Sequence, residues 1–389
     1  MENSINLSDF GFFMPTKVTF GVNKLNSIGE EVSCMGCKAL LVTGKSSARK
    51  HGYTQKIIDL LKEHNIETVV FEEVESNPDT LTINKGRDIA KKHNCDFIIG
   101  LGGGSALDAA KGIAAAVSEN RSVWDFVEGA TIEKEILPIV TIPTTAGTGS
   151  EATPYAVISN KEIKRKDAFA SKYIFPKLTI LDPSLTLSLS PYYTASSGID
   201  TLAHAIEAYS SVFANSVSDL FAVETIKLVS QNLRAAVSNG QNIIARSNMI
   251  LASTLAGIAI AQADTTIAHV IGEAVGAIFN TDHGTSVAIT LPYVMEYNCV
   301  SNLEKYANIA KLMGENTSNL TQREAAYKSS EAVRNLMKDI SLPLSLREIG
   351  VKEIKDVMNL VMRPGLTASN PRIVERDDFE IIVKRSFNL

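Results

Sequence analysis

The 389-residue sequence is poor in cysteine and in clustered positive charge. Its four cysteines are too few for the disulfide framework of a small secreted domain. Its net charge is −5, and its lysines and arginines are spread along the chain. The densest basic stretch, residues 161–166, is short and contains Glu162. Because proteins bind nucleic acid through clustered Lys and Arg, we expect no nucleic-acid partner.

Long apolar runs and a secretory signal are also missing from the sequence. The longest apolar run, residues 250–261, is followed by Asp264 and falls well short of the ~18 residues that a membrane span needs. It predicts a buried helix. The first ten residues lack the basic start and apolar stretch of a signal peptide. We therefore expect a cytoplasmic protein with no membrane partner.

Up to about residue 185, short β-branched runs alternate with helical stretches. Such short strands, buried on both faces and separated by helices, imply a parallel sheet covered by helices. The pattern predicts strands over residues 39–43, 68–71, 97–99 and 136–142, and helices over residues 55–65, 81–94 and 106–117.

After Pro191 the pattern changes to long runs of helix formers with few β-branched clusters. The breaks between the runs contain Gly, Asn or Pro, which end helices. We therefore predict an α/β domain over residues 1–185 and an all-α domain over residues 186–389. The helices are predicted over residues 195–211, 216–237, 241–263, 266–278 and 324–340.

A strand, a glycine turn and a helix start follow one another in residues 97–111. Gly102, Gly103 and Gly104 let the backbone turn sharply and approach a ligand, and Ser105 is expected to cap the helix. Backbone N–H groups and the helix dipole suit a pyrophosphate there. The motif is not G-x-G-x-x-G, so an ordinary Rossmann arrangement does not follow. A tight turn without a ligand is the alternative.

A second loop, residues 143–151, also follows a predicted strand and contains Thr144, Thr145 and Thr148. Small hydroxyl residues can bind a polar ligand without adding bulk, although a polar surface loop would look similar. Both loops leave the carboxyl ends of predicted parallel strands, where open α/β sheets bind ligands. Together they predict a nucleotide site.

Three of the six histidines lie in the predicted helical half, which also contains the carboxylate of Asp200. Asp200 and His204 are spaced i, i+4 and so project from one helix face. His269 lies among apolar residues of a predicted helix, and His283 lies in a predicted turn. One carboxylate with three imidazoles suits Fe²⁺ or Zn²⁺. The alternatives are that Asp200 and His204 form an ordinary helix pair, that His269 is a core histidine and that His283 is an exposed turn residue. Spacing alone does not show that the four side chains converge.

Four motifs, in this order and spacing, resemble those of the iron-containing (type III) alcohol dehydrogenases. The resemblance extends from residues 13–21 to residues 370–372. It implies a dehydroquinate synthase-like two-domain architecture, with a dinucleotide-binding domain before a metal-binding helical domain. It also implies reversible hydride transfer between NAD(P)(H) and a small alcohol or aldehyde, in a homodimer or larger homo-oligomer. The motifs are GGGSALDAAK (102–111), PTTAGTGSE (143–151), GIDTLAHAIEAY (198–209) and DHGTS (282–286).

The resemblance assigns roles to individual residues. It places the ligands of Fe²⁺ or Zn²⁺ at Asp200, His204, His269 and His283, which would form the catalytic centre. Gly102 to Ser105 would hold the pyrophosphate. The remaining cofactor-site residues that it implies are Asn77, Thr144, Thr145, Thr148 and Lys166, with Asp108 mainly organising the loop.

The first departure from the family pattern concerns the choice of cofactor. Family members that prefer NAD often have an Asp at the end of the first predicted strand, where this sequence has Gly44. Ser46 and Ser47 follow, with cations nearby. Removing the carboxylate makes room for a 2′-phosphate. We therefore expect a preference for NADP(H). The alternative is that the enzyme uses both NADP(H) and NAD(H).

The second departure lies in the helix around His269. The family usually has another histidine four residues later, where this sequence has Glu273. The usual glycine-rich segment before His269 is replaced by Asp264-Thr265-Thr266. A catalytic carboxylate here can accept a proton or reshape the pocket. A passive structural carboxylate is the alternative.

Two other classes of protein share parts of this pattern. A dehydroquinate synthase-like lyase would also combine NAD with a metal, but the motifs at residues 143–151 and 198–209 argue against it. A non-catalytic nucleotide-binding redox sensor would have no need of four metal ligands. The sequence does not reveal which alcohol or aldehyde is the substrate.

Overall fold

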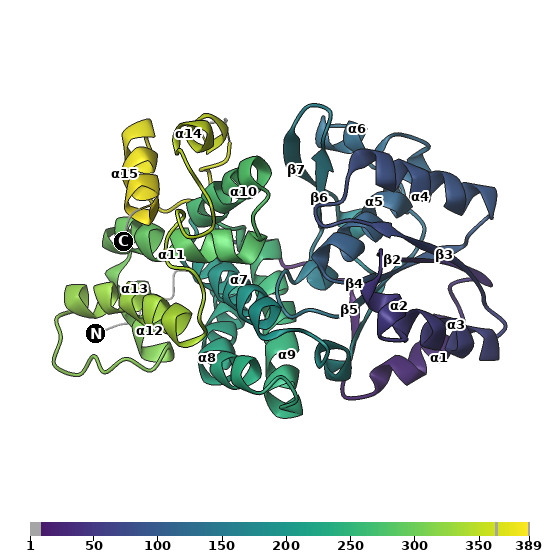
Figure 1. Ribbon diagram of the computed structural model, residues 1–389, viewed down its shortest axis with the longest axis horizontal. Coiled ribbons are helices and arrows are strands. Elements are labelled where there is room, and N and C mark those ends of the chain that lie inside the picture. Colours follow the sequence, from purple (N-terminus) through teal and green to yellow (C-terminus); the bar gives the residue numbers. More distant parts are fainter. Residues whose placement is uncertain (1–8, 362–364, 388–389) are drawn as a thin grey trace.

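A six-stranded parallel sheet forms one half of the molecule, and helices form the other (Figure 1). The computed structural model describes residues 9–361 and 365–387. The strand order is β1-β8-β5-β4-β2-β3, and every neighbouring pair is parallel. The carboxyl ends of the strands therefore share one edge, as predicted. The strands are β1 (Lys17–Phe20), β2 (Lys38–Gly44), β3 (Glu67–Val74), β4 (Phe97–Gly102), β5 (Ile139–Pro143) and β8 (Leu178–Leu181).

Both faces of the sheet are buried, because successive side chains of each strand point to opposite faces and each face packs against helices. In β2, Leu40 and Val42 belong to the core under α4 (Thr80–Lys92), α5 (Gly104–Glu119) and α6 (Val123–Val127). Ala39 and Leu41 belong to the opposite core. These two cores explain why the strands could be predicted from continuous apolar runs. The helices of the opposite face are α1 (Ile28–Val32), α2 (Ser47–Lys50) and α3 (Tyr53–Glu63).

The sequence pattern missed strand β1 and a separate hairpin, whereas the strand-like run that ends before Asp182 is β8. β1 is only four residues long and mostly exposed, so it does not resemble the longer buried strands. Strands β6 (Tyr155–Asn160) and β7 (Arg165–Ala170) pair antiparallel outside the main sheet. The hairpin stands beside α6 and faces the helical half (Figure 1).

The five predicted helices of the second half are present within a few residues as α7 to α10 and α13. The pattern missed α11, which is buried almost all round and contains Pro292, so it has no polar face to reveal its period. The helices are α7 (Pro191–Ser210), α8 (Ser216–Ser238), α9 (Ile243–Ala263), α10 (Ile267–Phe279), α11 (His283–Asn298), α12 (Leu303–Leu312), α13 (Gln322–Asp339), α14 (Lys355–Val361) and α15 (Arg376–Phe387).

Helix α9 is the core helix predicted from the apolar run at residues 250–261. By length and composition alone it could cross a membrane, but 67% of its most apolar window is buried inside the protein. It packs against α7 and α8 in one continuous core. This burial accounts for its apolar composition.

The loop after β5 and α9 meet backbone to backbone at two glycines. A Cβ atom added to Gly257 would lie 2.3 Å from the carbonyl oxygen of Gly149. Gly149 also has φ +61°, in the left-handed region that favours glycine. Beside this contact, the Thr254 hydroxyl donates to the buried Glu151 carboxylate at 2.7 Å. The loop of the sheet half is thus held directly on the helical half.

Gly257→Ala should destabilise the protein, because its methyl group would overlap the backbone of Gly149. We expect a loss of about 1–3 kcal/mol in the free energy of unfolding, measured by chemical denaturation. Gly276→Ala is the matched control, since its Cβ would meet nothing closer than 3.7 Å in α10. The control should gain up to ~1 kcal/mol from helix propensity. Equal stability of the two variants would contradict the proposed tight contact.

Candidate active site

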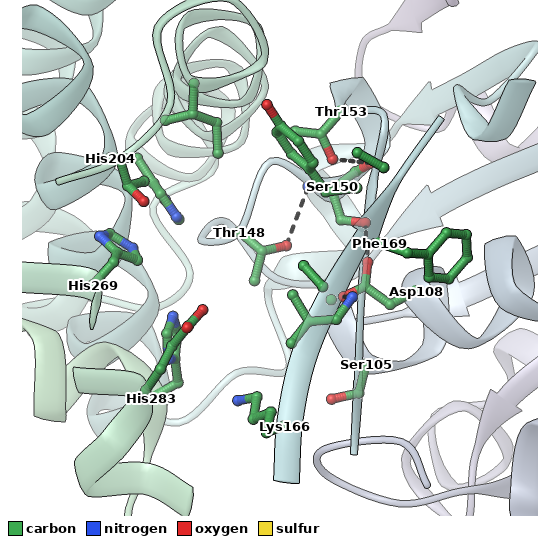
Figure 2. A pocket seen from close by; sticks show the side chains of 18 of the residues that line it. Ser105, Asp108, Thr148, Ser150, Thr153, Lys166, Phe169, His204, His269 and His283 are labelled. Atoms are coloured by element: carbon green, nitrogen blue, oxygen red, sulfur yellow. Dashed lines mark hydrogen bonds between the residues drawn. The ribbon is translucent and has the colours of Figure 1, made fainter. Parts of the chain in front are cut away.

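A cavity of about 430 Å³ lies between the carboxyl edge of the sheet and the helical half. Figure 2 shows His204, His269 and His283 on one side of it, facing residues of the sheet half. This volume is in the usual range for a small-molecule site. We call its two sides the sheet wall, which includes Ser105, Asp108, Thr148 and Lys166, and the helical wall, which includes His204, Asp264, His269, Glu273 and His283.

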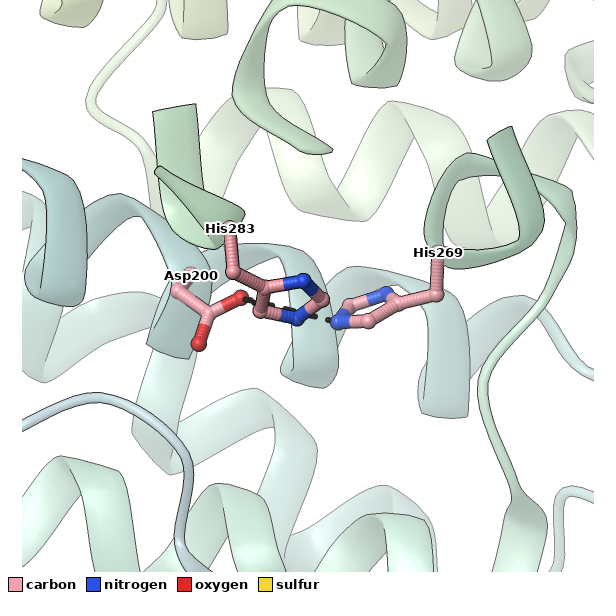
Figure 3. Close-up of side chains that lie close together, drawn as sticks. All are labelled: Asp200, His269 and His283. Carbon is pink, nitrogen blue, oxygen red and sulfur yellow. Dashed lines mark ion pairs between the residues drawn. The ribbon is translucent and has the colours of Figure 1, made fainter. Parts of the chain in front are cut away.

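Asp200, His269 and His283 converge from three different helices, as Figure 3 shows. One ligand atom from each lies within 4.8 Å of the others. The Nε2 atoms of His269 and His283 are 3.6 Å and 3.7 Å from Asp200 Oδ1. These distances are too long for hydrogen bonds. They leave space for a common partner between the three side chains.

His204 lies beside this group rather than inside it. Its Nδ1 atom is 4.0 Å from Asp200 Oδ2, and its ring stacks on His269 with centroids 4.4 Å apart. The structure therefore brings three of the four predicted ligands together and places the fourth next to them. Buried polar atoms without a partner are rare and costly. Among the described residues, they include Asp200 Oδ1, His204 Nδ1 and His269 Nε2 at this group, and also Nδ1 of His283, whose Nε2 faces Asp200. Carboxylate and imidazole groups of this kind fit a divalent metal ion.

The start of α11 brings His283 against Asp200. His283 is the first residue of this helix, so its predicted position in a turn is wrong. Asp282 caps the helix by accepting from the Thr285 N–H at 3.1 Å. A Cβ added to Gly284 would lie 2.3 Å from the carbonyl oxygen of Ser196, one turn before Asp200 in α7. This close approach leaves room only for glycine after the histidine.

Glu207 is a buried residue of the site that the sequence reasoning missed. Its Oε2 atom contacts His269 Nδ1, which turns His269 Nε2 toward Asp200. Its Oε1 atom accepts from the Thr266 N–H and hydroxyl and from the Ala268 N–H, at 3.0, 2.6 and 2.9 Å. A carboxylate that holds a ligating imidazole in this way is a recurrent feature of metal sites. The signal was its spacing, three residues after His204 on the same helix.

Burial and neighbouring charges set the ionisation of the three imidazoles. Desolvation lowers the pKa of His204 to about 4 and that of His283 to about 3. Both rings are therefore neutral at pH 7, the form that offers a lone pair to a metal. Desolvation opposes protonation of His269 as well, but the Glu207 and Asp200 carboxylates raise the pKa of that ring.

The glycine turn of the sheet wall packs against the second predicted loop. Cβ atoms added to Gly103 and Gly104 would lie 3.3 Å from Thr145 and 2.6 Å from Thr148. Gly103, not Ser105, is the N-cap of α5, so the predicted cap is wrong. With no room for side chains at the turn, the helix begins two residues earlier than the cap preference suggested.

Ser105 instead belongs to a chain of polar contacts along the sheet wall. Its hydroxyl accepts from the Asn77 N–H at 3.3 Å, and Lys166 Nζ donates to Asn77 Oδ1 at 2.8 Å. Three predicted cofactor residues, distant in sequence, are thus adjacent on the cavity wall. One short patch can therefore contact a single ligand.

Asp108 and Lys111 tie α5 to the segment that follows the second loop. Asp108 accepts from the Ser150 hydroxyl at 2.6 Å and from the Val157 N–H at 3.1 Å. Fully buried Lys111 donates to Thr153 and to the Tyr155 carbonyl, and burial lowers its pKa to about 8. Such hydrogen bonds support the expected role of Asp108 in organising the loop, and Lys111 contributes to the same contact.

The other predicted cofactor residues lie outside the cavity lining. Gly44 ends β2 with room beside it, since an added Cβ would lie 3.7 Å from the Val74 carbonyl oxygen. Ser46 and Ser47 are exposed just beyond, and Arg49 pairs with Glu72 at 2.5 Å. Those absent from the lining are Gly44, Ser46, Ser47, Gly102, Gly103, Thr144 and Thr145.

Comparison with known proteins gives matches along nearly the whole chain. Residues 15–183 match iron-containing alcohol dehydrogenase, and residues 194–387 match the C-terminal part of the Fe-containing alcohol dehydrogenase family. The chain is 38% identical over 382 residues to 1,3-propanediol dehydrogenase of Citrobacter freundii, which covers 97% of this chain and 99% of that one. It is 38% identical over 384 residues to choline dehydrogenase of Bacillus subtilis (strain 168), covering 97% and 95%.

A solved structure supports the same relationship. The crystal structure of a 1,3-propanediol oxidoreductase is 37% identical and has a TM-score of 0.94, covering 98% of this chain and 100% of that chain. Sequence and fold therefore agree over both halves. The chain belongs to the iron-containing alcohol dehydrogenase family, and it is an NAD(P)-dependent oxidoreductase of small alcohols and aldehydes.

Proposed function

We propose that Asp200, His204, His269 and His283 hold Fe²⁺ or Zn²⁺, and that the enzyme interconverts a small primary alcohol and its aldehyde with a preference for NADP(H). The observation that supports the metal site is the set of unpartnered buried atoms on these four residues. His204, His269 and His283 line a cavity whose opposite wall includes Gly104, the last residue of the glycine turn, and Ser105. Donor groups for a metal and backbone groups for a dinucleotide thus lie across one cavity.

The reaction conserves atoms and charge: the alcohol carbon gives a hydride to NAD(P)⁺ and the hydroxyl gives up a proton. When bound, the metal ion supplies Lewis acidity at the substrate oxygen, and the nicotinamide supplies the hydride acceptor. The protein orients the partners through Ser105, Asn77 and Lys166 on the sheet wall. Tyr155 and Phe169 add apolar surface to the lining of the cavity.

Glu273 follows His269 by one helical turn in α10, and both line the cavity. This position supports an active role over a purely structural one, because the carboxylate shares the cavity with the predicted ligands. It can accept a proton from the substrate directly or through water. It also adds negative charge beside the reacting end of the substrate.

The preference for NADP(H) is supported by Gly44 and its surroundings. No side chain fills the end of β2, and the exposed Ser46 and Ser47 follow. Lys45 and Lys50 are exposed nearby, whereas the charge of Arg49 is partly neutralised by Glu72. Hydroxyl groups and cations at this position favour a 2′-phosphate.

The organisation of the whole protein is part of the same proposal. The domains are residues 1–185 and 186–389, supported by the last sheet strand, which ends at Leu181, and by α7, which begins at Pro191. All four cysteines are free, which suits a reducing cytoplasm. The family resemblance supports a homodimer or larger homo-oligomer.

Protein reconstituted anaerobically with Fe²⁺ should oxidise NADPH in the presence of small aldehydes, and chelator should stop it. Cofactor absorbance measures the rate. His283→Ala should lose both bound metal and at least about 100-fold of the rate, since it removes a ligand. Full turnover by the metal-free protein would refute the metal mechanism.

Cofactor binding without turnover of any aldehyde would favour the redox sensor, and phosphate release from a sugar-acid phosphate would favour the lyase.

Gly44→Asp should shift the preference from NADPH toward NADH, because a carboxylate would repel the 2′-phosphate. We expect the ratio of kcat/KM for NADPH over NADH to fall about tenfold or more, equivalent to about 1.4 kcal/mol. Gly44→Asn is the matched control, since it adds the same bulk without the charge. If both variants change the ratio equally, bulk rather than charge sets the preference.

Glu207→Gln should weaken metal binding about 10–100-fold, because the amide no longer orients His269 as the carboxylate does. Metal affinity can be measured by competition with a chelator, with circular dichroism to confirm folding. Glu224→Gln is the control, as Glu224 lies on α8 with its side chain half exposed. Unchanged affinity in Glu207→Gln would show that the buried carboxylate serves folding alone.

A further inference from the structure

The two edge strands of the main sheet, β1 and β3, differ in how they are protected. Strand β3 carries Glu67, Glu72 and Glu73, and each pairs with a cation, at 2.8, 2.5 and 2.6 Å. Charged side chains on an edge strand keep other chains from pairing with it. The one charged residue of β1 is Lys17, which is paired with Glu31 at 2.7 Å. The edge at β1 therefore lacks the protection that β3 has.

The outer edge of β1 presents backbone groups at Val18 and Phe20. The N–H groups of Lys17 and Gly21 donate to carbonyl oxygens at the two ends of the β8 segment, at 3.1 and 3.0 Å. Because backbone groups of successive residues in a strand point to alternate edges, those of Val18 and Phe20 point away from β8. β1 is the last strand of the sheet, so no described strand pairs with them. Two residues thus offer donors and acceptors to an incoming strand.

The side chains along this edge are apolar and exposed. Lys17 and Thr19 both donate to Glu31 in α1, so Val18 and Phe20 face the other side of the sheet. There each of them is 40% exposed. Monomeric proteins usually carry exposed apolar side chains singly, so a concentration of them indicates a contact surface. The exposed large apolar residues in this segment are Phe10, Phe12, Phe13, Val18, Phe20 and Val22.

The segment before β1 is anchored to both halves of the molecule. Phe12 stacks on Phe221 of α8 with ring centroids 6.1 Å apart, and Phe13 meets Phe175 edge-on at 5.7 Å. The carbonyl oxygen of Phe13 accepts from Gln262 in α9 at 3.2 Å. These contacts hold β1 in place at the edge of the sheet. Beside the start of β1 lies a groove of about 280 Å³, whose lining includes Phe13, Pro15, Ile136, Tyr173 and Phe175.

We propose that β1 pairs antiparallel with β1 of a second copy of this chain, across a two-fold axis at Thr19. This register places Val18 opposite Phe20 of the second copy, and Phe20 opposite Val18, so the outward backbone groups of each pair bond to one another. Each pair joins a β-branched and an aromatic side chain on one face, a stabilising combination. Lys17 comes opposite Gly21 of the second copy, so no like charges meet. The two parallel sheets then become one continuous sheet.

A second copy suits this edge because the surface complements itself. In a two-fold contact both molecules use the same surface, which here supplies matching backbone groups and apolar side chains. The register also brings Val22 of the second copy near Thr16 and the groove beside it. Ile136 of that groove packs against the core under α4, α5 and α6, on the face of the sheet to which the exposed pair points. This inference rests on the homo-oligomer of the proposed function, for which it supplies the contact surface, and not on the proposed reaction.

Val18→Lys combined with Phe20→Lys should break the pairing, because lysines of the two copies would come opposite one another. The wild-type protein should have an even number of subunits. The variant should form a smaller assembly, with a dissociation constant raised about 100-fold or more. Analytical ultracentrifugation measures the mass, and circular dichroism confirms the fold. Leu81→Lys combined with Ile244→Lys is the matched control, since these exposed apolar residues lie on α4 and α9, and it should keep the wild-type mass.

Thr19→Cys tests the register directly. Residues that face each other at a non-hydrogen-bonded position of an antiparallel pair have Cα atoms ~4.5 Å apart, within the range of a disulfide. With the exposed Cys34 and Cys37 replaced by serine, mild oxidation should join two copies of the Thr19→Cys chain, as a non-reducing gel would show. Ser318→Cys in the same background is the control and should stay unlinked, since Ser318 is exposed outside the sheet.

Each outcome separates the contact surface from the rest of the proposed function. A monomeric wild-type protein would overturn both this inference and the homo-oligomer. An oligomer that the lysine variant leaves intact, or that dissociates equally in the control, would overturn the β1 surface alone. Absence of a cross-link in Thr19→Cys would do the same. The dehydrogenase reaction is tested separately by cofactor oxidation and stands or falls by that measurement.

Discussion

The active site depends on two backbone contacts that only glycine permits. Gly257 lets α9 touch the loop at Gly149, and Gly284 lets α11 touch Ser196 in α7. The first contact fixes the sheet wall relative to the helical wall. The second fixes His283 next to Asp200. Close-packed interiors do not absorb even one additional methyl group without displacement, so these contacts set the distance across the cavity.

The donor set imposes an energetic cost on the folded chain. A buried carboxylate and three imidazoles leave polar atoms without protein partners, and a buried polar atom that also lacks a water or metal partner costs about 1–3 kcal/mol. The buried Glu207 offsets part of this cost, since two of its four contacts satisfy the N–H groups of Thr266 and Ala268 at the start of α10. The same carboxylate therefore serves helix capping and ligand orientation. This double use explains how a site so poorly satisfied by protein atoms can keep its geometry.

The sequence was sufficient for β2, β3, β4 and β5, because strands such as β2 are continuous apolar runs that stay recognisable alone. It was not sufficient for β1, whose pattern is mostly exposed, or for α11, whose burial on all sides removes the helical period. The i, i+4 spacing placed Asp200 and His204 on one face. Spacing could not bring His269 or His283 to them, since that convergence depends on how three helices pack. Only the family resemblance joined the four in advance.

The two walls come from opposite halves of the chain, which lets each match one reactant. The sheet wall offers helix and loop N–H groups and Lys166, a set that suits the phosphates of a dinucleotide. The helical wall offers the three predicted histidine ligands together with Asp264 and Glu273. A carboxylate on the sheet wall would repel the phosphates of a cofactor unless its charge is offset, and that of Asp108 accepts hydrogen bonds from Ser150 and Val157. The groups that suit phosphates and the predicted metal ligands thus come from different elements, so each set can be held in place by the contacts of its own half.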